Sequence, residues 1–420
     1  MKILVIHQYY LGKGEPGGSR FNELARLWTE AGHDVTVIAG TLNYTTGKVP
    51  AHCQGRWVTC EQDGRVRVLR CHVPSTYARS YAGRMWSFFA FTLSSMSAVT
   101  LAGRSDVVVA TSPPLVTALT GAFAARWGRV PWIFEVRDLW PESAVTTGVL
   151  SRGSPLTHLL YRLEAFAYAD CDKVNVLTPA FREDILQRGL ALPDKIVFVP
   201  NGADPELFRP GPRDNEVRRE LGWGDRFVVM YAGAHGRANA LHQLVDAAEH
   251  LSNRPDILLA CVGDGPERIA LADEAKRRGL SNIVFHGSFP KSRMPELVNA
   301  CDVGAAVLQN NPTFHTVYPN KVFDYMACAR PVLLAIDGAA RKLVCEEAGA
   351  GVFAEPEDGR AIAEAVRELE ADAEGRVAMG DRGRTYVVAN LSRDVLATKY
   401  LELIEGLVCS GPDWVGSRQG

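Results

Sequence analysis

The sequence predicts an α/β protein built from two doubly wound parallel-sheet domains in tandem. Its 420 residues exceed the usual size of a single hydrophobic core, so two domains of about 200 residues are expected. Short β-rich runs alternate with helix-length amphipathic segments along nearly the whole chain, which is the pattern of βαβ units. One stretch rich in Pro, Gly and charge, PNGADPELFRPGPRD, interrupts this alternation and indicates a linker.

The first domain is predicted over residues 1–203. A strand at 2–7, a helix at 21–30 and a strand at 35–39 form the first βαβ unit. The alternation then continues to the linker. Further strands are predicted at 66–69, 106–110, 132–135, 173–177 and 196–199, with helices at 85–103, 115–127, 154–168 and 179–188.

The second domain is predicted over residues 204–390, and residues 391–420 are predicted as a helix that crosses back to the first domain and a loose tail. In such a pair of domains the carboxyl ends of both sheets border a central cleft, where ligands bind. The predicted strands are 227–232, 257–262, 283–286, 303–307, 332–336 and 351–353, and the helices are 238–251, 266–278, 292–300, 320–328, 338–348, 358–371, 376–386 and 392–408.

The composition, with 47% apolar and 22% charged residues, is that of an ordinary globular protein. The first half is mildly basic, a bias too weak to indicate nucleic-acid binding. The start of the chain has no signal-peptide pattern, and nine scattered cysteines indicate a reducing compartment, so we expect a cytoplasmic protein. The Cys and His residues at 52–72 match no common zinc spacing, and no metal site is predicted there. They are His52, Cys53, Cys60, Cys71 and His72.

Residues 85–103 form an uncharged stretch between Arg84 and Arg104. Because Ser and Thr interrupt it, a buried or membrane-surface helix is expected rather than a membrane span. Residues 77–92 are rich in aromatic residues and carry Arg79 and Arg84, which suits contact with the inner face of the plasma membrane. A helix of the protein core is the alternative.

Residues 318–331, YPNKVFDYMACARP, predict a loop that becomes a helix in front of a buried strand. A helix start directs backbone N–H groups and a positive dipole end toward Asn320 and Lys321, where an anion can bind. Asp324, about one turn later, would face the same space and accept hydrogen bonds from sugar hydroxyls. The alternative is a surface helix with a solvated Lys–Asp pair.

Loops after three other strands of the second domain combine small residues with polar groups. Small residues let a ligand approach the backbone, and an Arg offers a planar fork to phosphate oxygens. Because the ends of parallel strands meet at one sheet edge, these loops together predict a nucleotide site, although each alone fits an ordinary turn. The residues are Gly233, Gly236 and Arg237 in the first loop, Gly263 and Asp264 in the second, and His286, Gly287 and Phe289 in the third.

In the first domain, residues 12–17 read GKGEPG but do not follow their strand directly, and the second strand does not end in an acid, so dinucleotide binding is rejected. Gly17 and Gly18, beside Arg20, leave N–H groups at a helix start for a phosphate, or form a plain flexible turn.

A second loop of the first domain, RDLWPE, follows the strand 132–135 and presents several functional groups at a strand end. Asp138 suits an acceptor-orienting group or a base. The alternative is a structural ion pair between Arg137 and Asp138 or Glu142.

Taken in order, these motifs resemble those of the retaining GT-B glycosyltransferases of family 4. The similarity is strongest to the bacterial capsule, O-antigen and exopolysaccharide branch that adds N-acetylated aminosugars such as N-acetylfucosamine. The resemblance covers nearly the whole chain and implies two facing Rossmann-like domains with a central cleft. It rests on GGSRFNELARLWTEAGHDVTVI, SPPL, EVRDLWPES, VPNGAD, GAHGRA, VGDGPE, FHGSFP and PNKVFDYMACARPVL.

The resemblance implies a UDP-sugar donor in the second domain, a lipid-linked or saccharide acceptor in the first, and no metal or cofactor. By position, Arg237 and Lys321 correspond to the diphosphate clamp, and Asp324 corresponds to the family's ribose-binding Glu. Asp138 falls in the acceptor loop. The glycine pair 17–18 matches the loop near the diphosphate and acceptor, and residues 286–289 with 263–264 match donor-lining loops.

Two positions depart from the family pattern. The first Glu of the family's pair falls on Thr316, and the Lys that often follows the clamp Arg is replaced by Asn239 and Ala240. The predicted function is a retaining transfer of a sugar from a UDP-sugar to a lipid-linked or saccharide acceptor. A UDP-sugar epimerase of related architecture, or a catalytically silent UDP-sugar-binding partner, are the alternatives.

Overall fold

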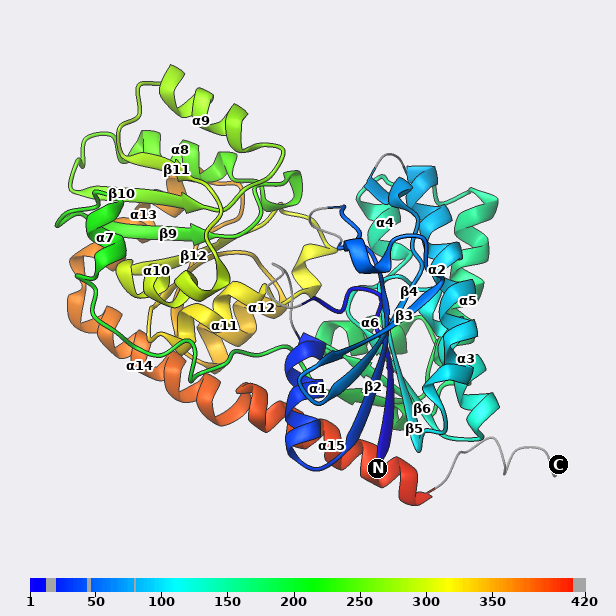
Figure 1. The fold of residues 1–420 in the computed structure, drawn as a ribbon. Coiled ribbons are helices and arrows are strands. Elements are labelled where there is room, and N and C mark those ends of the chain that lie inside the picture. Colours follow the sequence, from blue (N-terminus) through cyan, green and yellow to red (C-terminus); the bar gives the residue numbers. More distant parts are fainter. Residues whose placement is uncertain (13–19, 44–46, 79–80, 411–420) are drawn as a thin grey trace. The chain divides into compact units, whose positions relative to one another are not determined.

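The structure is a computed structural model that describes residues 1–12, 20–43, 47–78 and 81–410. The chain forms two compact units (Figure 1). Unit 1 comprises Met1–Pro200 and the chain from Ala397 onward, and unit 2 comprises Asn201–Leu396. Each unit is a Rossmann-like α/β domain built on its own sheet.

Unit 1 contains an eight-stranded sheet in the order β3-β4-β2-β1-β5-β6-β7-β8. All neighbouring strands run parallel except the pair β3–β4. Its central strands are buried along their whole length, as expected for a parallel sheet that is covered on both faces. The strands are β1 (Lys2–Ile6), β2 (Asp34–Gly40), β3 (Val58–Asp63), β4 (Val66–Cys71), β5 (Val107–Ser112), β6 (Trp132–Val136), β7 (Lys173–Val176) and β8 (Ile196–Phe198).

Strand β3 was missed by the sequence analysis. It pairs antiparallel with β4, from Asp63 opposite Val66 to Val58 opposite Cys71. The turn between them contains Gly64 in the left-handed region, at φ +60°. An Asp-Gly dipeptide between two alternating runs is a strong hairpin signal, so the strand was readable from the sequence.

The helices of unit 1 include one contributed by the end of the chain. Trp28 of the first helix is fully buried, its indole N–H donates to the Ala397 carbonyl at 3.3 Å, and its ring lies 5.4 Å from that of Tyr400. The last helix therefore completes the core of this unit. The helices are α1 (Arg20–Glu30), α2 (Tyr81–Ala102), α3 (Thr117–Gly128), α4 (Glu142–Thr146), α5 (Pro155–Asp170), α6 (Pro179–Gln187) and α15 (Arg393–Ser410), with short 3-10 turns η1 (Ala51–Cys53), η2 (Ser75–Ala78) and η3 (Pro193–Lys195).

Unit 2 contains a six-stranded, fully parallel sheet in the order β11-β10-β9-β12-β13-β14. Its strands are β9 (Phe227–Ala232), β10 (Ile257–Val262), β11 (Ile283–His286), β12 (Val303–Val307), β13 (Val332–Ala335) and β14 (Gly351–Phe353). Its helices are α7 (Glu216–Glu220), α8 (His242–His250), α9 (Arg268–Arg277), α10 (Met294–Ala300), α11 (Asn320–Ala327), α12 (Ala339–Arg341), α13 (Gly359–Ala371) and α14 (Ala373–Asn390), with short turns η4 (Arg237–Asn239), η5 (Lys291–Arg293), η6 (Phe314–Thr316) and η7 (Lys342–Glu347).

Two helices of unit 2 differ from their predicted form. Ala240 adopts a left-handed conformation, at φ +45°, so the predicted helix 238–251 is divided into η4 and α8. The predicted helix 338–348 is α12 followed by the π-helical segment η7. Because of the first difference, Arg237 lies in a 3-10 turn rather than just before the start of an α-helix.

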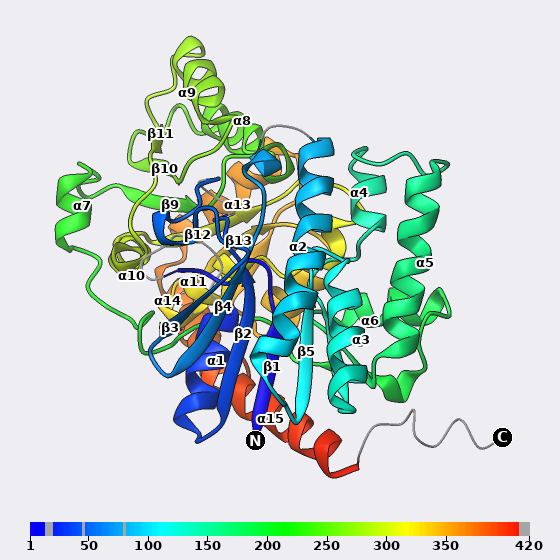
Figure 2. The ribbon, with the colours of Figure 1, turned by 45° about the vertical axis from the view of Figure 1, so that its right-hand side comes forward.

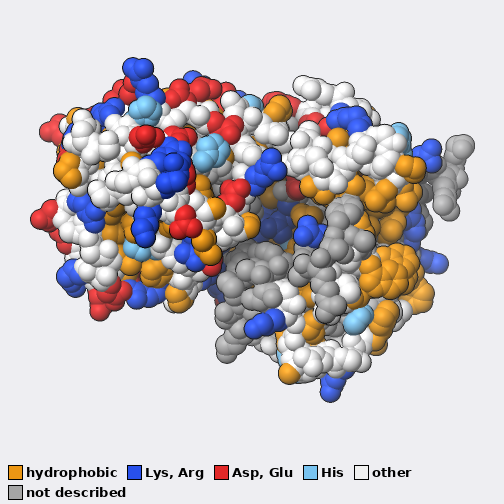
Figure 3. All heavy atoms as spheres, turned by 90° about the horizontal axis from the view of Figure 1, so that it is seen from above, with side chains coloured by type: hydrophobic (Ala, Val, Ile, Leu, Met, Phe, Trp, Pro, Cys, Tyr) orange, Lys and Arg blue, Asp and Glu red, His pale blue; other side chains and the backbone are white. Residues whose placement is uncertain are grey.

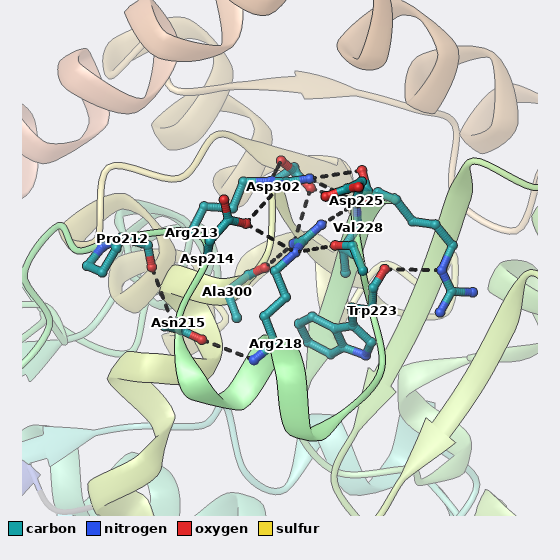
Figure 4. Close-up of polar contacts among 12 residues, drawn as sticks. Pro212, Arg213, Asp214, Asn215, Arg218, Trp223, Asp225, Val228, Ala300 and Asp302 are labelled. Atoms are coloured by element: carbon teal, nitrogen blue, oxygen red, sulfur yellow. Dashed lines mark hydrogen bonds and ion pairs between the residues drawn. The ribbon is translucent and has the colours of Figure 1, made fainter.

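A partly buried arginine network holds the beginning of unit 2 to its sheet (Figure 4). The Arg213 guanidinium donates to Asp302 at 2.6 Å, and Asp302 also accepts the Val228 N–H at 2.8 Å. Arg218, with a side chain only 3% exposed, donates to the carbonyls of Gly224 (2.8 Å), Ala300 and Arg226. The predicted linker region is thus fixed firmly to the second sheet.

Candidate active site

In unit 2, three consecutive strand-end loops are joined by backbone hydrogen bonds. The Gly233 N–H donates to Val262 O at 2.9 Å, and the His235 N–H donates to Asp264 O at 2.9 Å. The Gly263 N–H in turn donates to Gly287 O at 3.2 Å. Because β9, β10 and β11 are parallel neighbours, these loops share one sheet edge. The structure therefore brings together the three loops that the sequence analysis singled out.

Glycine is required where these loops touch. Gly263 has φ +135°, and a Cβ there would lie 1.9 Å from the Gly233 carbonyl oxygen. A Cβ on Gly265 would lie 2.5 Å from the His235 carbonyl oxygen. The loops can pack backbone to backbone only without side chains at these positions.

Lys321 reaches these loops from the first turn of α11. Its Nζ lies 3.6 Å from the centre of the Tyr231 ring. A Cβ added to Gly233 would lie 2.9 Å from the same Nζ. The Tyr231 hydroxyl is fixed by the Ala234 carbonyl and the Asn239 amide oxygen, both at 2.8 Å. Burial lowers the Lys321 pKa to about 7. An ammonium held at this point would gain strongly from an anionic ligand.

Asp324 lies one turn further along α11. Burial raises the pKa of its carboxyl to about 7, although Arg393 and Lys291 favour the ionised form. The predicted alternative, a solvated Lys321–Asp324 pair, is not present among the ion pairs of the described residues. Burial instead brings the pKa values of both groups close to pH 7.

The second predicted clamp residue, Arg237, and the predicted donor residue Asn320 belong to the same unit. The Arg237 side chain is exposed and forms no ion pair with any residue that the structure describes. It lies in η4, directly before Ala238, whose carbonyl accepts the Gln309 N–H at 3.0 Å. Asn320, the first residue of α11, accepts a hydrogen bond from the Asn201 amide at 2.9 Å. Arg237 thus has the freedom to contact a phosphate.

Three other predicted donor-lining side chains have partners within unit 2. His286 Nε2 accepts the Trp223 indole N–H at 3.2 Å, and Phe289 packs against the core. Asp264 accepts from Arg268 at 2.9 Å, which lowers its pKa. These side chains shape their loops, while Gly287 is exposed at the loop surface.

Thr316 marks the position where the family's first Glu was expected. It closes the turn η6, and its hydroxyl donates to the Thr313 carbonyl at 2.7 Å. Next to it, His315 Nε2 lies 3.0 Å from the Asn310 amide oxygen. This turn therefore supplies a hydroxyl and an imidazole in place of a carboxylate.

In unit 1, Arg20 is a structural residue. Its guanidinium forms two hydrogen bonds with Glu135, at 3.0 and 3.2 Å, and donates to the carbonyls of Val199 (2.8 Å) and Pro200. The Glu135 side chain is completely buried, so it requires this counter-charge. Arg20 accordingly stabilises the buried Glu135 of β6. Gly17 and Gly18 lie outside the described residues.

Polar residues gather where β1, β5 and β6 end. His7 is buried, its Nδ1 lies 2.7 Å from the Thr111 hydroxyl, and its Nε2 lies 3.5 Å from an Arg137 nitrogen. Burial and the nearby arginines lower the His7 pKa, so the ring is neutral at pH 7. Asp138, after the end of β6, has its pKa raised by burial, although Ser143 bonds to it. His7 was not predicted as a site residue, and its place as the last residue of the predicted strand 2–7 was the available signal.

The Cys and His cluster of the first half is only partly assembled. His52, Cys53 and Glu61 place their ligand atoms within 4.8 Å of one another. Arg70 donates to one Glu61 oxygen, and His52 Nε2 lies 2.9 Å from the other. The Glu61 carboxylate is thus already engaged by Arg70 and His52. Cys60, by contrast, is exposed.

Each half of the chain matches a family model. Residues 17–202 match the glycosyl transferase 4-like domain, and residues 213–386 match the glycosyl transferases group 1 family. Two solved structures share the fold over the length of the chain. Anabaena HepE in complex with UDP matches with a TM-score of 0.72 and 19% identity over 97% of this chain and 100% of HepE. Sucrose-phosphate synthase from Thermosynechococcus elongatus matches with a TM-score of 0.76 and 18% identity, over 97% and 99%.

Sequence relatives support the same grouping. The chain is 27% identical over 304 residues to the probable glycosyltransferase WbjE of Pseudomonas aeruginosa, covering 70% of this chain and 74% of WbjE. It is 22% identical over 377 residues to the putative colanic acid biosynthesis glycosyl transferase WcaI of Escherichia coli strain K12, covering 88% and 92%.

Two Rossmann-like domains in one chain, with these structural neighbours, define the GT-B class of α/β proteins. The predicted fold class is therefore confirmed. Within that class, the chain belongs to the glycosyltransferases that combine a 4-like first domain with a group 1 second domain.

Proposed function

We propose that this protein is a retaining glycosyltransferase that moves a sugar of the N-acetylated aminosugar class from a UDP-sugar to a lipid-linked or saccharide acceptor. The reaction would serve the synthesis of a cell-surface polysaccharide or glycoconjugate. The observation that carries the proposal is the position of Lys321, held against the glycine loops of unit 2 with its charge unpaired by any described carboxylate. The similarity to WcaI and to the UDP complex of HepE supports it.

The proposed chemistry depends on charge stabilisation of the departing diphosphate. Lys321, Arg237 and the N–H groups at the start of α11 would neutralise the charge that develops on the leaving group, so no metal is required. Asp324 would accept hydrogen bonds from the ribose. Removing one such donor costs about 10² in turnover in comparable sites.

On the acceptor side, we assign Asp138 to orient or deprotonate the acceptor hydroxyl. Burial raises the pKa of its carboxyl, which makes the carboxylate a stronger base toward the acceptor hydroxyl. The acceptor would attack on the same face as the leaving diphosphate, which retains the configuration without an enzyme nucleophile. We place the enzyme in the cytoplasm, on the inner face of the plasma membrane.

The test is to incubate the protein with a panel of UDP-sugars, with and without a lipid-linked oligosaccharide fraction, and to measure UDP release. The proposal expects release that depends on the acceptor, and an α-linked product from an α-linked donor by NMR. Conversion of the donor without acceptor would identify an epimerase instead. Binding of UDP-sugar with no release from any donor and acceptor pair would identify a silent partner.

A further inference from the structure

The outward faces of three helices in unit 1 form an apolar surface, which we call the three-helix face. Helix α2 packs against α3, and α3 packs against α5, so their outer sides lie next to one another (Figures 1 and 2). Among its residues, Trp127 is 64%, Leu159 62% and Trp86 56% exposed. The exposed large apolar side chains of the face are Trp86, Phe89, Leu93, Leu101, Trp127, Leu156, Leu159 and Phe166.

Such a concentration of exposed, large apolar side chains is unusual within the molecule. Single exposed apolar residues are normal on a soluble protein, whereas a continuous group indicates an interaction surface. Every large aromatic side chain that is exposed in the described part of the chain lies in unit 1. Figure 3 shows apolar side chains gathered on this unit, with few acidic ones among them.

The exposed charges of the face are mostly positive. Arg84, Arg126, Arg129 and Arg162 are exposed on or directly after these helices. The described parts of α2, α3 and α5 contain two acids, and both are already bound. Glu164 is buried and bonded to Arg188, and Asp170 is bonded to Arg126. The face is therefore complementary to a surface that is apolar and negatively charged.

The inner side of α2 is packed into unit 1, which argues against a membrane span. Residues 83–102 are long and apolar enough to span, with a mean hydropathy of 1.3, but half of that stretch is buried in the protein. Ser95 lies 2.8 Å from the Thr120 hydroxyl, and Ser94 donates to His72 O at 3.0 Å. If α2 left unit 1 to span a membrane, these hydrogen bonds would break and the core of unit 1 would be exposed.

We propose that the three-helix face docks the protein on a membrane that contains anionic phospholipids. Aromatic side chains would enter the interface, and the arginines would bind lipid phosphates, each contributing about fivefold in affinity. A second copy of the chain is a poorer occupant, because it would bring the arginines of one face, Arg129 and Arg162 among them, against those of the other. This proposal rests in part on the proposed function, because a lipid-linked acceptor would lie in the membrane. Lipid binding itself is tested without any sugar.

The experiment is flotation of the full chain with vesicles of phosphatidylcholine, with and without phosphatidylglycerol. We expect binding only to the anionic vesicles at 0.1 M NaCl, and weaker binding at 1 M, where the Debye length falls from about 10 Å to about 3 Å. The double variants Trp86→Ser/Trp127→Ser and Arg129→Glu/Arg162→Glu should each lose more than tenfold in partitioning.

Matched controls come from unit 2. Ile269→Ser/Val377→Ser alters apolar residues that are 67% and 65% exposed, and Arg277→Glu/Arg360→Glu alters arginines that are 71% and 77% exposed. Neither should change partitioning. Equal binding to both vesicle types, retained binding in both test variants, or dimerisation that the test variants abolish would each overturn the proposal.

Thermal protection by UDP-glucose, measured in the same proteins, separates the two proposals. The test variants should keep the protection of the parent protein, which also shows that they fold. If neither UDP-glucose nor UDP-N-acetylglucosamine protects the parent protein or any variant, the donor assignment fails while the vesicle result stands.

Discussion

The pKa values of Lys321 and Asp324 make a quantitative prediction about donor binding. Both groups titrate at about 7 in the free protein. At pH 8, about nine-tenths of Lys321 is neutral, so forming an ammonium against a diphosphate requires proton uptake. At pH 6, about nine-tenths of Asp324 is protonated, so forming a carboxylate acceptor for ribose requires proton release.

Proton uptake by Lys321 and proton release by Asp324 oppose each other, and the pH decides which of them is larger. Binding of UDP-glucose should take up about 0.8 proton at pH 8, release about 0.8 proton at pH 6, and exchange almost none at pH 7. Affinity should accordingly be highest near pH 7 and fall about tenfold for each pH unit well away from it. UDP-glucose is the right ligand, because a terminal phosphate such as that of UDP itself titrates near pH 6.

Calorimetric titration in buffers of different ionisation enthalpy measures the number of protons exchanged. Asp324→Asn should keep the uptake at pH 8 and lose the release at pH 6, whereas Lys321→Met should do the reverse and bind more weakly. A proton exchange close to zero at both pH values in the parent protein would refute the reasoning.

Three further predictions concern single side chains. Arg237→Ala should lower turnover by about 10² while folding normally, with Arg277→Ala as the exposed control, and near-normal turnover would remove Arg237 from the clamp. Gly263→Ala should lower Tm and weaken UDP-glucose binding, because its Cβ would lie 1.9 Å from the Gly233 carbonyl oxygen. The control Gly153→Ala, which has open space around it, should change neither, and equal Tm values would contradict the packing. Arg218→Met removes the Arg218 hydrogen bond from the carbonyls of Gly224 and Ala300, while Arg226 O keeps a bond from Arg213 at 3.1 Å. The change should cost about 3 kcal/mol, or roughly 6–12 °C in Tm, whereas the exposed Arg219→Met should leave Tm unchanged.

Most strands of both sheets could be predicted from the sequence, because buried parallel strands are apolar along their whole length. The strand β3 was missed because it lies at the sheet edge, where only some of its residues are buried. Helix α8 begins later than predicted because Ala240 takes a left-handed conformation, which an alanine gives no reason to expect.

The site shows a similar division. Lys321 and the glycine loops were found from the sequence, since loops at the ends of parallel strands meet at one edge. That Lys321 lies over the ring of Tyr231 depends on packing between residues ninety positions apart, and no local pattern reports it. Arg20 was assigned to a phosphate loop, yet it bonds to Glu135. A lone acid inside the buried strand 132–136 was the overlooked sign that an arginine must be near it.

The return of the chain to unit 1 has a consequence for synthesis. Unit 2 is a continuous segment and can complete its fold as soon as it has emerged, whereas unit 1 lacks residues 397–410 until the whole of unit 2 has been synthesised. At about 5–20 residues per second, roughly 10–40 s separate the emergence of Pro200 from that of Tyr400. During that interval Trp28, fully buried in the finished protein, has no partner helix. The nascent first domain would therefore present an apolar groove to chaperones until the last helix closes it.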